Sequence, residues 1–319
     1  MTTEYHNPVM LAECIDGLAL KPGGVYVDVT FGGGGHSRAI LNAMVPDEKG
    51  NAGKLLVFDQ DPDARANAAA IDDSRLTFIA ANFRNLKRYL RLYGVRQVDG
   101  ILADLGISSH QIDTPDRGFS TRFEADLDMR MNQQGDLTAK QVVNSYPEAD
   151  LHRILGMYGE LTNARTAAAA LVSARANQTI QTINDLKDAL KRCAPRGKEN
   201  KYFAQVFQAL RIEVNDELKV LEEFLEQTPE VLAPGGRLVV MSYHSLEDRL
   251  VKNFINKGKF SGEVEKDLYG NEIKPLHGVT RKPVEAGPEE VARNPRARSA
   301  KLRIAEKGEE GGKGGGKKG

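Results

Sequence analysis

Short apolar runs alternate with segments of helical periodicity along the first hundred residues. Residues 25–29 form an apolar run, residues 32–35 are four glycines, and apolar side chains then recur at Ile40, Leu41 and Met44. A continuous apolar run is typical of a buried strand, whereas three- and four-residue spacing is typical of a helix. The pattern therefore predicts a strand, a glycine turn and a helix.

The same alternation continues to about residue 105. Apolar runs at 55–58, 77–79 and 100–105 predict strands, and the segments at 62–70 and 86–93 predict helices. Pro62 suits the first turn of its helix, and Gly94 suits the end of the next one. Strands that alternate with helices at this spacing predict an α/β fold with a parallel, doubly wound sheet of the Rossmann-like type.

The alternation stops between residues 114 and 200, where no run reads as a strand. Helical patterns cover 138–145, 147–157, 164–176 and 183–193, and Thr182 and Asp185 have the spacing of a capping box. A longer apolar stripe predicts one helix over 202–232, followed by a tight turn at 234–236 and a strand at 237–242. A helix at 246–255 and a final strand at 299–306, on the sheet edge, complete the expected fold.

These elements predict one sheet domain that is interrupted by a helical insertion. We expect the sheet domain to comprise residues 1–113 and 201–307, and an all-helical subdomain that recognises the substrate to comprise residues 114–200. The tail, residues 308–319, contains glycines and charged residues only. Such a composition has too little apolar surface to fold, so we expect a disordered tail.

Composition and charge limit the class of protein. Apolar residues make up 40% and charged residues 28% of the chain, as in globular proteins, and Lys+Arg and Asp+Glu are both 44. A polyanion would therefore have to be held by a local basic cluster. Cys14 and Cys193 have no metal-binding spacing, and no apolar run is long enough to span a membrane. We expect a cytoplasmic location, with no metal and no membrane partner.

The glycines at 32–35 are the first candidate binding site. Glycine has no side chain to keep a ligand away from the backbone, although a purely structural turn has the same composition. Asp59 follows the second strand, 24 positions after Gly35, where an acid can accept hydrogen bonds from ribose hydroxyls. Because NAD enzymes use the same arrangement, these residues alone leave the nucleotide cofactor open.

Three further features favour S-adenosylmethionine. Asp28 precedes the glycines, Asp104 ends the fourth strand, and a Pro-Gly-Gly turn leads into the late apolar strand. The two carboxylates could accept hydrogen bonds from the amino end of the cofactor, and its sulfonium also favours nearby negative charge. Asp28 could instead be a cap or turn residue, and His36 could be a solvent-facing imidazole.

Other candidates follow the ends of predicted strands. Phe83 could cover an adenine ring or pack in the core, and Gln111 could contact the cofactor or be an exposed loop amide. Tyr243, His244 and Ser245 follow a buried strand, so they could contact the substrate or form an ordinary polar loop. The carboxyl ends of parallel strands meet at one sheet edge, which is where doubly wound sheets bind ligands.

A cluster of five cations lies near the carboxyl end of the chain. No acid interrupts the eleven residues that contain Arg293, Arg296, Arg298, Lys301 and Arg303. A phosphate backbone requires such a local cluster, although many charge runs are only solvated surface. We therefore expect RNA contacts here, with Arg298 and Lys301 as the candidate substrate-binding residues.

Several strings together resemble the RsmH (MraW) family of ribosomal RNA small-subunit methyltransferases over nearly the whole chain. The cofactor loop at 30–37, the strand-four motif at 104–109 and the long helix at 207–217 are similar to the family pattern. The strings at 117–120, 127–131 and 242–249 are more specific, because methyltransferases in general do not share them. The N-terminal positions His6, Pro8, Val9, Leu11 and Glu13 and the stretch 294–303 also resemble the family, whereas the glycine-lysine tail departs from it.

The resemblance implies a class I methyltransferase that uses S-adenosylmethionine. Its expected target is the exocyclic N4 amine of a cytidine in the decoding region of 16S rRNA in the small ribosomal subunit. The implied cofactor contacts are Gly34, Gly35, His36, Asp59, Phe83, Asp104 and Gln111.

The candidate catalytic residue is Asp104. The target base must leave its stack to reach such a site, and Phe119 and Tyr243 could receive it, with Arg117 as another substrate contact. Two alternatives remain at this point: an RNA-binding assembly factor with a retained cofactor pocket, and an NAD-dependent oxidoreductase. A homodimer is also left open.

Overall fold

The computed structural model describes residues 8–308. These residues form two compact units, of which the first contains residues 8–106 and 220–308 and the second contains residues 107–219. The expected domain boundaries stay a prediction. His6 of the N-terminal string and residues 309–319 of the tail lie outside the described residues.

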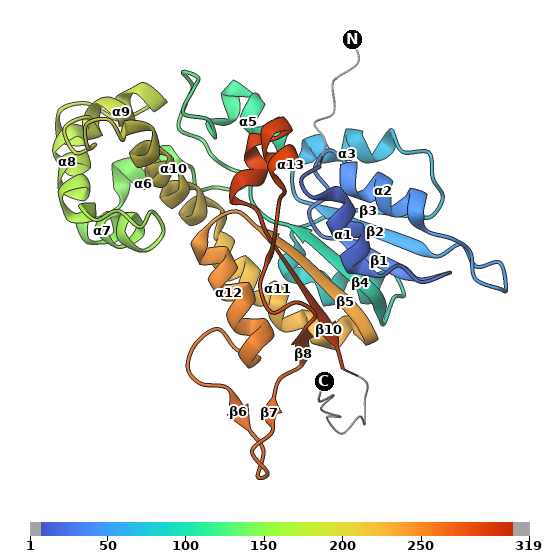
Figure 1. Ribbon diagram of the computed structural model, residues 1–319. Coiled ribbons are helices and arrows are strands. Elements are labelled where there is room, and N and C mark those ends of the chain that lie inside the picture. Colours follow the sequence, from blue (N-terminus) through green and yellow to red (C-terminus); the bar gives the residue numbers. More distant parts are fainter. Residues whose placement is uncertain (1–7, 309–319) are drawn as a thin grey trace. The chain divides into compact units, whose positions relative to one another are not determined.

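The first unit contains an eight-stranded mixed sheet (Figure 1). Its main strand order is β3-β2-β1-β4-β5-β10-β8, and β9 also pairs with β10. Strands β1 to β5 pair in parallel, whereas β10 runs antiparallel to β5, β8 and β9. The bounds are β1 Val25–Asp28, β2 Lys54–Asp59, β3 Leu76–Ala80, β4 Val98–Asp104, β5 Leu232–Ser242, β8 Leu276–Gly278, β9 Val284–Glu285 and β10 Lys301–Lys307. This order confirms the predicted α/β fold with a parallel doubly wound core.

Helices cover both faces of this sheet because its strands are apolar on both sides. In β2, Leu55 and Val57 pack into one core cluster, while Leu56 and Phe58 pack into the other. This alternation follows the two-residue period of a strand. The first face packs on α1 Leu11–Leu18, α2 Gly35–Ala43 and α3 Pro62–Ala69, and the second on α4 Leu86–Leu92, α11 Glu217–Val231 and α12 Ser245–Lys257.

The carboxyl ends of the parallel strands bring several polar residues to one edge of the sheet. Asp28 ends β1, Asp59 ends β2, Asp104 ends β4 and Ser242 ends β5. Since β1, β2, β4 and β5 are parallel neighbours in the sheet, these positions share that edge. The first unit therefore has the ligand-binding edge that its sequence predicted.

Two sequence-based expectations about the second half of the chain are wrong. The helix expected over 202–232 is two helices, α10 Glu199–Asn215 and α11, because Asp216 between them has a left-handed φ of 53°. Aspartate adopts this region more readily than most residues, so it can end a helix without glycine. The final strand β10 is also not at the edge, since β8 and β9 pair with its outer side. Strands of two or three residues leave almost no periodic signal in a sequence.

The turn expected at 234–236 lies within the bounds of β5. Gly235 has a φ of 70°, and the register between β4 and β5 shifts between Val98 and Gly100. The backbone thus bends at the glycines, as expected, but strand pairing begins before the bend, at Leu232. A bend inside a paired strand is a bulge-like irregularity, for which glycine is well suited.

The second unit is helical, as expected for the insertion. Its helices are α5 Ser109–Asp113, α6 Ala139–Ser145, α7 Glu148–Met157, α8 Ala164–Asn177, α9 Ile183–Leu190 and α10. They surround one apolar core, in which Leu151, Leu171 and Leu210 are fully buried. Thr182 forms the predicted capping box with Asp185 at the start of α9.

The segment between α12 and β10 contains small elements. Strands β6 Glu265–Lys266 and β7 Glu272–Ile273 form a separate hairpin, and α13 Pro288–Arg293 precedes β10 (Figure 1). Within residues 8–308, none of the helices combines the length and the apolar character that crossing a bilayer requires.

Candidate functional site

The glycine loop after β1 has a backbone that only glycine tolerates well. Gly32 and Gly34 have positive φ values of 51° and 77°, and the Gly34 amide donates to the Phe31 carbonyl at 2.8 Å. A Cβ atom on Gly34 would lie 2.8 Å from the Phe31 ring, and one on Gly35 would lie 2.4 Å from Cγ of Pro8. The loop therefore has no room for side chains at Gly34 and Gly35, and α2 begins directly at Gly35.

Asp28 orders this loop from beneath. Its carboxylate accepts hydrogen bonds from the Ser37 hydroxyl at 2.6 Å and from the Thr30 amide at 3.0 Å, and the residue is 1% exposed. Burial raises the pKa of Asp28, while the hydrogen bonds from Ser37 and Thr30 oppose this shift. These contacts favour the turn-residue alternative for Asp28 over direct contact with a cofactor.

Asp59 connects β2 to the glycine loop. One carboxylate oxygen accepts from the Gly32 amide and the other from the Asp61 amide, both at 2.8 Å. Burial raises the pKa of Asp59 to about 6, although both backbone hydrogen bonds act in the opposite direction. An ionised carboxylate can accept about four hydrogen bonds, so each oxygen keeps capacity for a ribose hydroxyl.

Asp104 contacts residues of three different segments at this edge. Its amide donates to the Thr30 hydroxyl at 2.7 Å, and its carboxylate accepts from the Tyr243 hydroxyl at 2.7 Å. His36 Nδ1 lies 3.6 Å from the other carboxylate oxygen. Burial raises the pKa of Asp104 to about 6, while His36 and Tyr243 oppose the shift. Because the side chain is still 24% exposed, a ligand can reach a carboxylate that two neighbours hold in place.

His36 is buried, contrary to the solvent-facing alternative. It is 6% exposed, and its Nε2 atom lies 3.1 Å from the Val9 carbonyl oxygen. A carbonyl oxygen only accepts hydrogen bonds, so Nε2 must be the donor and must carry a proton. The imidazole is thereby oriented with Nδ1 toward Asp104, 3.6 Å from its carboxylate, so His36 is a residue that packs against and positions this side chain.

These donors and acceptors fit S-adenosylmethionine. The molecule presents ribose hydroxyls, an ammonium group and a positively charged sulfonium, all of which favour carboxylate acceptors. Asp59 and Asp104 offer such acceptors at one sheet edge, beside a glycine loop that has no side chains to keep a ligand away. The acidic edge therefore matches a ligand of positive charge better than one that carries phosphates.

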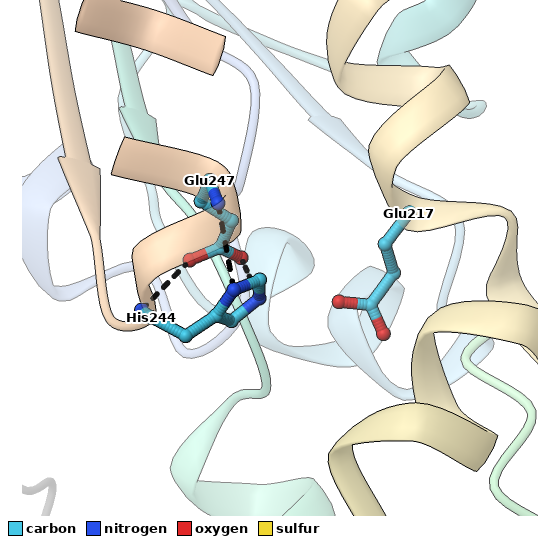
Figure 2. Close-up of side chains that lie close together, drawn as sticks. All are labelled: Glu217, His244 and Glu247. Atoms are coloured by element: carbon cyan, nitrogen blue, oxygen red, sulfur yellow. Dashed lines mark hydrogen bonds and ion pairs between the residues drawn. The ribbon is translucent and has the colours of Figure 1, made fainter. Parts of the chain in front are cut away.

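The segment after β5 shapes the same edge. The Tyr243 amide donates to Glu247 at 2.9 Å, and His244 caps α12 by accepting from the Glu247 amide at 3.4 Å. Figure 2 shows the His244 ring beside the Glu247 carboxylate, 3.2 Å from Nε2 to oxygen. Ser245, the first residue of α12, is exposed. This arrangement fixes the direction in which Tyr243 reaches Asp104.

His244 and Glu247 both carry side-chain atoms of the kind that bind metal ions, and these atoms lie close together. Zinc sites in proteins use at least three protein ligands. His244 and Glu247 together offer two, and Glu217, which is drawn with them in Figure 2, belongs to the second unit. Within the first unit, the contacts between these two residues are those of a capping box at the start of α12.

Comparisons with known proteins identify the family. Residues 3–308 match the model of the MraW methylase family. The chain belongs to this family. A protein of Cytophaga hutchinsonii named ribosomal RNA small subunit methyltransferase H is 59% identical to it, covering 95% of this chain and 99% of its own length. A Flavobacterium johnsoniae protein of the same name is 57% identical, covering 96% and 99%.

Family membership confirms the resemblance of the sequence to the RsmH (MraW) family. The methylase is a Rossmann-like methyltransferase with S-adenosylmethionine as its cofactor. The oxidoreductase alternative is thereby excluded. The roles of individual residues in the methylase stay predictions, and the contacts of each residue show how well its predicted role agrees with its surroundings.

Phe83 and Gln111 have structural contacts in addition to their predicted cofactor roles. Phe83 is partly buried and packs edge-to-face on Phe224, with ring centroids 5.3 Å apart. Gln111 is 5% exposed and forms a capping box with Ser108 at the start of α5. Gln111 belongs to the second unit, and the contact predicted between it and the cofactor stays a prediction.

Arg117 and Phe119 lie inside the second unit, although the sequence predicts them to contact the substrate. The Arg117 guanidinium donates to the carbonyls of Arg130 and Met131 at 3.0 and 3.2 Å and is 8% exposed. Phe119 is 7% exposed and belongs to the apolar core of this unit. Both side chains therefore have structural contacts within this unit, and their predicted contacts with the substrate stay predictions.

The cluster of cations before the tail is partly neutralised. Arg303 forms a bidentate pair with Asp248 at 2.7 and 3.1 Å, and Lys301 Nζ lies 3.9 Å from the same carboxylate. Arg298 is exposed. Sequence reasoning missed Asp248 as a partner because it lies on α12, 55 positions before Arg303.

Proposed function

We propose that the methylase transfers the methyl group of S-adenosylmethionine to the exocyclic N4 amine of a cytidine in the decoding region of 16S rRNA. The observation that carries this proposal is the Asp104 carboxylate, held by Tyr243 and His36 and partly exposed beside the glycine loop. Its relatives named ribosomal RNA small subunit methyltransferase H support the choice of RNA. We further propose that the reaction takes place in the cytoplasm.

The acidic edge would bind the cofactor through its hydroxyl and ammonium groups. Asp59 would accept hydrogen bonds from the ribose, because one of its oxygens already accepts from the Gly32 amide of the glycine loop, beside which the adenosine would lie. Asp104 would accept from the ammonium end. The bound cofactor supplies an electrophilic methyl group on its sulfonium.

The target amine is a poor nucleophile, because its lone pair is conjugated into the cytosine ring. Catalysis must therefore come mainly from holding the amine in line with the methyl group. Asp104 is also the candidate residue for orienting the amine, since a carboxylate with a pKa of about 6 is mostly ionised at neutral pH. A methylated amine of this kind is strongly acidic, so the carboxylate or water suffices to take up the proton.

The base must also be outside its helical stack when it reacts. Tyr243 lies where the target would arrive, at the carboxyl edge and hydrogen-bonded to Asp104. Its aromatic ring could stack on an extruded base. The exposed Ser245 begins the helix next to it and offers a hydroxyl to the RNA.

Transfer of labelled methyl groups to small subunits isolated from cells that lack the methylase tests this proposal. We expect one methyl group per subunit, located by mass spectrometry on N4 of one cytidine. Asp104→Ala should abolish transfer, while Asp72→Ala, which removes an exposed carboxylate on the loop after α3, should not. Labelling of a carbon atom, or no labelling at all, would refute the stated chemistry.

A further inference from the structure

The surface of α4 carries an unusual run of positive charge. Arg84, Lys87, Arg88, Arg91 and Arg96 lie between residues 84 and 98, and this stretch contains no acid. The whole chain, in contrast, has equal numbers of acidic and basic residues. A polyanion is therefore attracted only where such a run remains uncompensated in the folded protein.

Acidic residues of α11 compensate only the first part of this run. Arg84 pairs with Glu223 at 2.7 Å, and Lys87 pairs with Glu230. Arg88, Arg91 and Arg96 are exposed, and no acidic side chain within residues 8–308 forms an ion pair with them. Three cations thus remain available on this surface.

The surface is hollowed and firmly supported. Arg84, Lys87, Arg88 and Arg91 line a shallow pocket together with Leu92 and Gln227. The Gln227 amide donates to the Arg84 carbonyl at 2.8 Å, and its oxygen accepts from the Lys87 amide at 3.0 Å. These two hydrogen bonds tie the start of α4 to α11, so the backbone that carries Arg88 and Arg91 is held in place.

Exposed apolar side chains follow the cations. Leu92 is 74% exposed and Tyr93 is 45% exposed, although large apolar residues are otherwise mostly buried in this unit. An aromatic ring beside arginines is a typical combination for single-stranded nucleic acid, because the ring stacks on a base while the guanidinium groups contact phosphates. An acidic protein surface would not require the aromatic ring.

We propose that Arg88, Arg91, Tyr93 and Arg96, the α4 surface, bind the phosphate backbone and an unstacked base of the ribosomal RNA. This inference rests on the proposed function, because it takes the same RNA as the ligand. The chain leaves β3 at the carboxyl edge of the sheet, where Asp104 lies, and enters β4 at the opposite edge. Helix α4, which connects the two strands, therefore starts near the edge of Asp104 and leads away from it. RNA bound along α4 would thus extend from the reacting base.

Salt-dependent binding of the full-length methylase to protein-free 16S rRNA and to isolated small subunits tests the α4 surface. The test variant is Arg88→Gln/Arg91→Gln, and the control is Lys49→Gln/Lys54→Gln, which removes one exposed lysine on the loop before β2 and one at the start of β2. Losing two phosphate contacts to a single strand lowers the slope of log affinity against log salt by about 1.4. If both proteins bind equally at 1 M salt, this difference in slope makes the test variant bind about 25-fold more weakly than the wild type at 0.1 M salt.

The expected result is this loss for the test variant with both probes, and no comparable loss for the control. Tyr93→Ala should weaken binding without changing the slope, because stacking releases no counterions. An unchanged affinity and slope for the test variant would overturn the inference. So would a loss that occurs with subunits but not with protein-free rRNA, because the surface would then contact a ribosomal protein.

Two readouts separate this inference from the proposed function. Cofactor affinity, measured by calorimetry, and the midpoint of thermal unfolding should be unchanged in the test variant, because Arg88 and Arg91 touch neither the core nor the acidic edge. If rRNA binding depends on α4 but no methyl group is transferred, the inference stands and the proposed function fails. If transfer occurs and binding is independent of α4, the reverse holds.

Discussion

The hydrogen bond from Tyr243 to Asp104 allows a quantitative prediction for Tyr243→Phe. The 2.7 Å bond stabilises the ionised carboxylate, so its loss should raise the pKa of Asp104 above about 6. Hydrogen bonds to buried charged groups contribute about 1.5–3 kcal/mol, and the 24% exposure of Asp104 places this bond near the lower limit. About 1.4 kcal/mol corresponds to about one pKa unit, so we expect a pKa of about 7 in the variant.

Cofactor binding measured at several pH values reveals this shift. If binding requires the ionised carboxylate, the ionised fraction at pH 6 falls from about one half to about one tenth, which weakens affinity about fivefold. At pH 8 both proteins are almost fully ionised, and their affinities should agree closely. The assay is calorimetric titration with S-adenosylmethionine from pH 5.5 to 8.5, with unfolding followed in parallel to verify the fold.

Tyr89→Phe is the matched control, because this tyrosine packs edge-to-face on Phe58 and makes no hydrogen bond to the acidic edge. Its affinity should follow the wild-type curve at every pH. A Tyr243→Phe variant that binds more weakly by the same factor at pH 6 and pH 8 would refute the electrostatic reasoning. The tyrosine would then act by shape alone.

Three further predictions concern the loop, the second unit and the charge of the edge. Gly34→Ala should destabilise the methylase by at least about 1 kcal/mol and weaken cofactor binding, because φ is 77° and the new Cβ would meet the Phe31 ring. Gly50→Ala is the control in the same denaturation assay: its φ is 82° but its Cβ would enter open space, so it measures the cost of the backbone conformation alone. Phe119→Ala should lower the free energy of unfolding by about 3–5 kcal/mol, whereas a substrate role alone would leave urea denaturation unchanged. Binding of the cationic cofactor should lower the pKa values of Asp59 and Asp104 from about 6, so protons should be released near pH 6 and not at pH 8, as titrations in buffers of different ionisation enthalpy would measure.

The sheet could be predicted from the sequence because its order depends on local patterns. The apolar runs of β1, β2 and β4 each end in an aspartate, and a helical pattern follows the first two of them, so period and spacing alone lead to a parallel sheet. The same reasoning failed for β8 and β9, which have two or three residues and become strands only by pairing with β10. A helix break at a single left-handed aspartate, Asp216, is equally invisible to periodicity.

The candidate site was predictable as a set of strand ends, but the tasks of its residues were not. Asp28 and Asp59 both follow strands, yet one is closed off by Ser37 and Thr30 and the other keeps acceptor capacity beside Gly32. The sequence contains no signal for the Tyr243–Asp104 bond, which joins residues 139 positions apart. The same limitation explains why Arg303 was predicted to contact phosphate. In the sequence it belongs to a cluster of cations, and only the fold brings Asp248 next to it.

The three carboxylates of the edge, Asp28, Asp59 and Asp104, repel one another, and this repulsion indicates that the edge binds a positively charged ligand. Burial raises the pKa of each, and the charge of Asp28 raises the pKa values of Asp59 and Asp104 further. A protein selected for stability alone would gain by replacing one of them, since a buried charge without a cation is costly. The nearest compensating group is His36, whose Nε2 proton is committed to the Val9 carbonyl. A ligand that brings both a sulfonium and an ammonium group relieves this repulsion, so the strain that the free protein carries becomes affinity for a methyl donor and against phosphate-bearing cofactors.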